Sequence, residues 1–88
     1  MGRKVVVKVT GSLFDPSNMG GELFSLVEGF KKHHGEGVKF FIVTGGGKTA
    51  RRYIEVAREK GVGEASLDML GILISRVNAQ LLIYLLGE

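Results

Sequence analysis

The 88-residue sequence contains no cysteine, no tryptophan and a single proline. Without cysteine there is no disulfide framework, and a zinc site would have to use histidine and carboxylate ligands alone. A chain of this length buries only about 60–65% of its unfolded surface, so the core is expected to be thin. A complete two-domain enzyme is excluded, and we interpret residues 1–88 as one domain or part of one.

Neither sign of charge dominates, because the formal net charge is only +3 and the cations are spread along the chain. Nucleic-acid binders usually have a denser basic patch with interleaved aromatics, so a nucleic-acid partner is disfavoured. The basic pair Arg3-Lys4 precedes only three valines before Lys8, which is too short for a signal peptide. We therefore expect a cytoplasmic protein.

Long uninterrupted apolar runs are also lacking. The most apolar segment, Leu67–Leu86, is interrupted by five polar residues: Asp68, Ser75, Arg76, Asn78 and Gln80. A charge near the centre disfavours a membrane span, so we predict a helix that is covered on several sides within the protein. The spacing of Asp68, Gly71, Ser75 and Asn78 places these four residues along one side of that helix.

Glycine is in excess, with 14 residues in 88, about twice the usual share of roughly 7%. Three are consecutive, at residues 45–47. With one proline and no low-complexity segment, this excess indicates tight backbone contacts.

The pattern of apolar residues predicts an α/β fold in the order β-α-β-α-α. Valine-rich Lys4–Thr10 and the run Val38–Val43 read as strands buried on both faces. Helical spacing predicts helices over 21–34, from near Lys48 to about residue 60, and over 67–86. The intervening helix makes the two strands parallel. Because a two-stranded sheet is marginal, the chain reads as the front portion of a larger fold or as one completed by association.

A strand, the loop Thr44–Gly47 and a helix form a junction that is typical of phosphate binding. Bare backbone N–H groups and the positive helix end attract an anion, and glycine lets it approach. Lys48, Arg51 and Arg52 add charge on the first turn, where cations oppose the helix dipole but neutralise a ligand. A glycine turn with a solvated basic face is the alternative.

Two named motifs fit this junction less well. Gly47-Lys48-Thr49 matches the end of a Walker A loop, but the first glycine would fall at Ile42, inside the strand. The pattern Gly45-x-Gly47-x-x-Ala50 matches a dinucleotide fingerprint, although Glu64 and Asp68 do not end a second strand of that unit. Dinucleotide binding therefore stays as an alternative.

A second glycine junction, Lys8 to Ser12, follows the first strand. In a parallel sheet both loops open on the same carboxyl edge, where α/β folds bind ligands. Lys8 within a valine strand is costly unless its ammonium reaches water or an anion at that edge. These two readings of Lys8 remain open at this point.

Three ordered motifs together resemble the amino-acid kinase family, most closely its archaeal-type uridylate (UMP) kinases. They are Lys8-Val9-Thr10-Gly11-Ser12, the run Thr44 to Tyr53, and Leu67-Asp68-Met69-Leu70-Gly71-Ile72 with Ser75-Arg76-Val77-Asn78-Ala79. The resemblance runs through essentially all 88 residues and covers the amino-terminal, phosphoacceptor-side part of that family's domain.

The resemblance implies an α/β/α sandwich that transfers a phosphoryl group from ATP to UMP, with Mg²⁺, in a dimer-based hexamer. It implies that Lys8 is catalytic and that Lys8, Gly11 and Ser12 contact the transferring phosphates. Gly47 and Arg51 would bind the ATP phosphates. Gly45, Gly46 and Asp68 would bind UMP, and the 67–86 helix would form the dimer contact. The family's ATP-side carboxyl-terminal part lies outside these residues, so the 88-residue piece alone is expected to be inactive.

Other residues have simpler interpretations. His33 and His34 are read as a solvated helix end, Phe40, Phe41 and Tyr53 as core, and Asp15 as a turn residue. The apolar 67–86 helix also supports a different class of function, a non-catalytic oligomerisation module.

Overall fold

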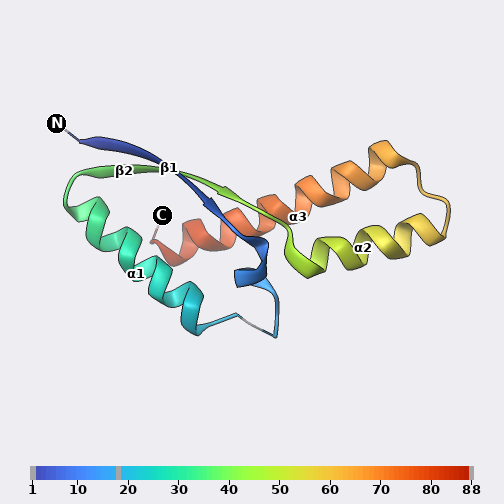
Figure 1. Cartoon of the computed structure of the whole chain (residues 1–88), viewed down its shortest axis with the longest axis horizontal. Helices are drawn as coiled ribbons and strands as arrows, with labels where there is room; N and C mark the ends of the chain where they lie inside the picture. Colours follow the sequence, from blue (N-terminus) through green and yellow to red (C-terminus); the bar gives the residue numbers. More distant parts are fainter. Residues whose placement is uncertain (1, 18, 88) are drawn as a thin grey trace.

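A computed structural model describes residues 2–17 and 19–87 of the chain. The elements in order are β1 (Arg3–Val9), the 3₁₀ helix η1 (Gly11–Phe14), α1 (Gly21–Gly35), β2 (Val38–Thr44), α2 (Gly47–Glu59) and α3 (Glu64–Leu85) (Figure 1). The predicted α/β class and element order are confirmed. The last helix begins at Glu64 instead of Leu67, because Gly63 in extended conformation already serves as its N-cap.

The two strands pair in parallel, with Arg3 opposite Val38 and Val9 opposite Thr44. Both strands therefore end at the same level of the sheet. The segments that follow them, η1 and the glycine loop, emerge side by side at this carboxyl edge. This juxtaposition is what the sequence predicted for parallel strands.

Each strand buries only one face, which corrects the prediction of strands buried on both. Val9 and Thr44 are buried, whereas Val6 is 75% exposed on the opposite face. The reason is that α1 and α3 lie on the same side of the sheet, so within the described residues the opposite face has no covering layer (Figure 1). The described residues thus form two layers of the expected three-layer sandwich.

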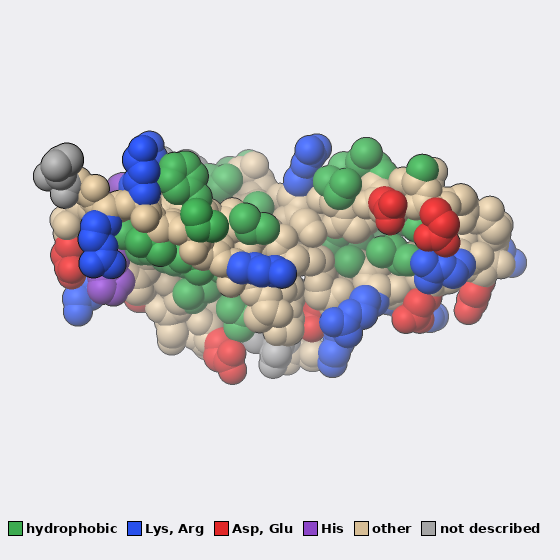
Figure 2. All heavy atoms as spheres, turned by 45° about the horizontal axis from the view of Figure 1, so that its top comes forward, with side chains coloured by type: hydrophobic (Ala, Val, Ile, Leu, Met, Phe, Trp, Pro, Cys, Tyr) green, Lys and Arg blue, Asp and Glu red, His purple; other side chains and the backbone are tan. Residues whose placement is uncertain are grey.

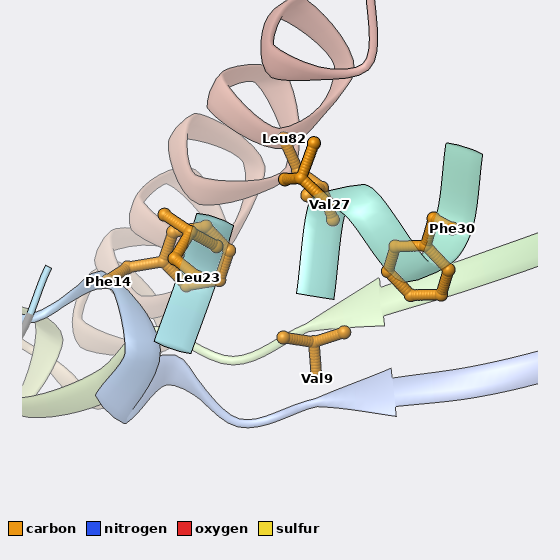
Figure 3. Close-up of a cluster of buried hydrophobic side chains, with 6 residues drawn as sticks. All are labelled: Val9, Phe14, Leu23, Val27, Phe30 and Leu82. Carbon is orange, nitrogen blue, oxygen red and sulfur yellow. The ribbon is translucent and has the colours of Figure 1, made fainter. Parts of the chain in front are cut away.

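The core lies between the sheet, α1 and the last turns of α3. Figure 3 shows six buried side chains that meet there: Val9, Phe14, Leu23, Val27, Phe30 and Leu82. The three from α1 are spaced four and three residues apart, so they share one face of the helix. Phe30 also contacts Phe40 edge-on, with ring centroids 4.8 Å apart.

The molecule is elongated, with extents of 51 × 27 × 18 Å. Its radius of gyration is 15.1 Å, against about 12 Å for a compact chain of this length. Figure 1 shows the cause: α2 and the first half of α3 form an antiparallel pair that projects beyond the sheet. Leu67 is buried between these two helices.

Most of α3 is exposed, which contradicts the prediction that it is covered on several sides. Only 11% of its most apolar stretch is buried, and by length and composition alone the helix could cross a membrane. The exposed apolar residues of α3 are Met69, Ile72, Leu73, Val77, Ile83 and Tyr84. Figure 2 shows hydrophobic side chains at the surface over the strands and over the projecting helices. Phe41 and Tyr53, predicted as core, are 46% and 56% exposed.

Candidate functional site

The first loop and the glycine loop are in backbone contact at the carboxyl edge. The Gly45 N–H donates to the carbonyl of Val9 at 3.1 Å, which continues the parallel pairing by one residue. A Cβ built on Gly11 would collide with the backbone nitrogen of Gly47 and lie 2.7 Å from its Cα. Gly11 is therefore required by the neighbouring loop itself.

Both the backbone conformation of Gly47 and the space around it exclude a side chain. Its φ of +65° lies in the left-handed region, and a Cβ there would lie 2.5 Å from both the Asp15 carboxylate and the Gly11 carbonyl oxygen. Gly45 has more room, with the Gly11 nitrogen 3.2 Å from its Cβ position. The glycine cluster thus combines a left-handed turn with two close backbone approaches.

The two loops surround a hollow of about 640 Å³ at the start of α2. Three cationic residues line it, Lys8 from β1 and Lys48 and Arg51 from the first turn of α2, together with Asp15. All three cationic side chains are exposed, so Lys8 reaches water at this edge. The predicted residues that line the hollow are Lys8, Gly11, Ser12, Gly45, Gly46, Gly47 and Arg51.

Asp68 lies apart from this group, in a second hollow of about 730 Å³ between α2 and α3. Because α3 begins four residues before it, Asp68 stands one turn inside the helix on the side that faces α2. Gly46 lines both hollows, so it joins the predicted phosphate residues to Asp68. Arg76 also lines the second hollow and is exposed.

Helix α3 holds the glycine loop through two hydrogen bonds. The Asn78 side-chain amide donates to the Gly45 carbonyl at 2.8 Å, and the Thr44 hydroxyl donates to the Ser75 carbonyl at 2.7 Å. The sequence placed Ser75 and Asn78 on one side of the helix, and that side faces the loop. The bond partners were not predicted, because helical spacing gives a face and not what it contacts.

Asp15 was interpreted as a turn residue; it lies in a bend that leads into a turn, and it is also a buried part of the site. It is 4% exposed, and its Oδ1 accepts a hydrogen bond at 2.9 Å from the backbone N–H of Lys48. The aspartate that follows η1 therefore caps α2, whose N-cap residue makes no side-chain hydrogen bond. The motif Asp-Pro-Ser carries a strong turn signal, and only the tertiary contact reveals the second role.

The other sequence hypotheses find less support. Among residues 2–17 and 19–87, no group of three or more His, Cys, Asp or Glu side chains is arranged to hold a metal ion. His33 and His34 are exposed at the end of α1, where His33 lies 3.6 Å from Glu36. Glu64 and Asp68 both lie within α3, so neither ends a strand as a dinucleotide site requires.

Fold and site together define a parallel α/β unit whose glycine loop and cationic side chains meet at the carboxyl edge. Residues 3–88 match the Amino acid kinase family, and the chain belongs to that family. It is 47% identical over 85 residues to a uridylate kinase of Sulfurisphaera tokodaii, covering 97% of this chain and 37% of the relative. It is 45% identical over 86 residues to a uridylate kinase of Methanoculleus marisnigri, covering 98% of this chain and 36% of the relative.

A third relative, the uridylate kinase of Sulfolobus acidocaldarius, is 45% identical over 86 residues and is covered to 37% of its length. The chain thus spans little more than a third of the curated relatives that it matches. The predicted family resemblance is confirmed.

Proposed function

We propose that this chain forms the amino-terminal, phosphoacceptor-side part of a UMP kinase domain, which transfers a phosphoryl group from ATP to UMP. The observation that carries the proposal is the meeting of Lys8, Lys48 and Arg51 with two glycine loops in one hollow. Likeness to uridylate kinases along nearly the whole chain supports the choice of substrate class.

In the proposed reaction, an oxygen of the UMP phosphate attacks the γ-phosphorus of ATP. The bond from that phosphorus to the β,γ-bridging oxygen breaks, so the products are UDP and ADP. Such a transfer needs positioning and charge neutralisation more than a covalent nucleophile. Exposed cations around backbone N–H groups suit that requirement.

Each residue has a proposed role. Lys8 is the catalytic cation and, with Gly11 and Ser12, contacts the transferring phosphates. Gly47 and Arg51 bind the phosphates of ATP. On the UMP side, Gly45 and Gly46 approach the phosphate, and Asp68 accepts hydrogen bonds from the nucleoside.

Mg²⁺ is part of the proposal as a companion of ATP. Protein-bound Mg²⁺ usually takes one or two carboxylates together with substrate phosphates and waters. The described residues offer no cluster of three ligands, and the Asp15 carboxylate already accepts the Lys48 N–H. We therefore expect the nucleotide phosphates to carry the ion, whose charge would offset that of the phosphates.

The exposed apolar stripe of α3 supports a further part of the proposal, a dimer-based homo-oligomer that reaches a hexamer in the cytoplasm. Helix–helix contact between copies would cover side chains such as Val77, which is 66% exposed. In this proposal the stripe meets protein and not a membrane, because Asp68 and Arg76 are costly inside a bilayer.

A thermal shift experiment tests the nucleotide-binding part of the proposal. Millimolar UMP or Mg-ATP is expected to raise the melting temperature of the 88-residue chain, and Arg51→Ala is expected to remove most of that rise. Arg52→Ala is the matched control, because Arg52 is next in sequence, lies outside the hollow and pairs with exposed Glu55. Absence of any shift with both nucleotides would contradict binding by this chain.

An oligomerisation module without catalysis is the second candidate, supported by the same α3 stripe. It predicts self-association with no nucleotide shift. We expect the 88-residue chain to bind nucleotide without efficient transfer, because it spans 37% of a catalytic relative's length.

A further inference from the structure

Asp15 is the most completely buried charged side chain at the site. It is 4% exposed and lies directly after Phe14, a core residue that is also 4% exposed. The preceding 3₁₀ helix is capped by Thr10, whose hydroxyl accepts the Ser12 N–H at 3.4 Å. The Asp15 carboxylate is therefore held between the core and the hollow by a short, anchored element.

The Asp15 carboxylate lies against the glycine loop and the first residues of α2. Oδ1 accepts the Lys48 N–H at 2.9 Å and would lie 2.5 Å from a Cβ on Gly47. Lys48 is the second residue of α2, so this bond satisfies an N–H that the helix cannot satisfy internally. A carboxylate at this end also favours the helix dipole.

The same bond links the two chain segments that carry the cations. Lys8 and Gly11 belong to the chain segment that leads to Asp15, whereas Lys48 and Arg51 belong to α2. The Gly11 and Gly47 backbones touch beside the bond. The hydrogen bond from Lys48 to Asp15 thus fixes the start of α2 against the first loop and brings both sets of cations to one hollow.

We propose that Asp15 is a positioning residue for nucleotide binding, acting through the hydrogen bond it accepts and not through its charge. The inference rests on the proposed function. Because Asp15 lines the hollow beside three cations, its negative charge opposes an anionic ligand. The hydrogen bond that it accepts from Lys48 positions the start of α2, and this accounts for an acid among the cations.

Two substitutions of Asp15 distinguish the effect of its hydrogen bond from the effect of its negative charge. Asp15→Asn keeps an oxygen that accepts the Lys48 N–H and removes the charge, whereas Asp15→Ala removes both. We expect Asp15→Ala to weaken Mg-ATP and UMP binding about tenfold, the size of one lost hydrogen bond. Asp15→Asn is expected to bind as tightly as the parent chain or more tightly. Glu22→Ala and Glu22→Gln are matched controls, because Glu22 is an exposed acid in the first turn of α1.

Affinity is measured by calorimetry, and amide hydrogen exchange of Lys48 and Gly47 is measured by NMR without ligand. Protection of Lys48 is expected to persist in Asp15→Asn and to be lost in Asp15→Ala, while the Glu22 variants change neither readout. Equal or tighter binding in Asp15→Ala would overturn the inference, as would loss of binding in Asp15→Asn.

The two proposals fail in different ways. If the parent chain binds neither nucleotide, the proposed binding function fails, and Lys48 exchange alone decides the role of Asp15. If Asp15→Ala does not fold, the Asn variant decides: preserved Lys48 protection with undiminished affinity supports the inference, and lost protection or weaker binding contradicts it.

Discussion

Gly11 and Gly47 lie against each other's backbone, and this contact determines how closely the two loops approach. Both positions exclude a Cβ for reasons within the protein: crowding at Gly11, and crowding with a φ of +65° at Gly47. Close packing of the loops brings cations from distant parts of the sequence together. The two glycines therefore determine the shape of the hollow. In the proposed function they also let a phosphate group come close to the backbone.

Gly11→Ala is expected to destabilise the chain by about 1–3 kcal/mol, because the new methyl group overlaps the Gly47 backbone, which has little freedom to move. Gly29→Ala has the opposite expectation, a gain of roughly 0.5–1 kcal/mol, because Gly29 lies inside α1 with no atom within 4 Å of its Cβ position. Urea unfolding of both variants measures the difference. Equal effects of the two substitutions would show that the loops do not touch as described.

Asn78→Ala is expected to cost about 1 kcal/mol, because the Gly45 carbonyl loses its 2.8 Å donor while alanine slightly favours the helix. Gln80→Ala, on the exposed side of the same helix, is expected to be neutral or slightly stabilising. Unfolding by urea again gives the comparison, and a Gln80 effect as large as that of Asn78 would contradict the anchoring role.

At the residue scale, much of the site could be predicted from the sequence. Glycines after two parallel strands and cations on a first helical turn are local patterns, and their meeting follows from the sheet. Asp15 could not be assigned in this way, because its partner Lys48 is 33 positions away and its turn motif already accounts for it. The hydrogen-bond partners of Asn78 and Thr44 could not be predicted either, because they are 33 and 31 positions away in the sequence.

Among the elements, α3 has two different environments along its length. Its last turns pack Leu82 into the core, whereas Leu67 in its first half is buried beside α2. The sequence predicted a helix covered all round because apolar residues occupy nearly every side. The structure instead leaves a large apolar stripe exposed, and such a stripe is typical of an interaction surface.

Val77→Glu is expected to reduce self-association, because a charge would enter the centre of the proposed contact between copies of α3. Burial of an unpaired carboxylate should raise the dissociation constant at least about tenfold. Ser25→Glu adds the same charge at an exposed position on a different helix, α1, and serves as the control. Sedimentation velocity measures both variants, and a parent chain that stays monomeric at all concentrations would contradict the oligomer.

The burial of the two strands also differs from what their apolar residues predict. Valine at nearly every position of β1 indicates a strand buried on both faces, yet Val6 is 75% exposed. The apolar residues of a strand indicate that both of its faces are suited to packing against another layer. Whether a face is buried depends on whether such a layer is present in the chain. The apolar side chains on the bare face, Val6, Phe41 and Val43, are suited to the third layer of the sandwich.

The whole molecule exposes 6284 Å², against roughly 5,000 Å² for a compact monomer of its mass. The excess is larger than the roughly 800 Å² that one partner buries in a standard protein interface. Exposed apolar side chains on the bare sheet face and on α3 account for much of it. This agrees with a chain that spans little more than a third of the length of its relative from Sulfurisphaera tokodaii.

In the proposed function the two loops form one phosphate-binding hollow, and an NMR titration of the ¹⁵N-labelled chain observes both loops at once. Addition of Mg-ATP or UMP is expected to shift the backbone amides of Gly11, Ser12 and residues 45–48 together, with the Arg51 amide. Amides of 33–36, at the opposite end of the sheet, should stay unchanged. A single hollow formed by both loops would be contradicted if millimolar nucleotide left the amides of both loops unmoved, or if the shifts were confined to residues outside the hollow.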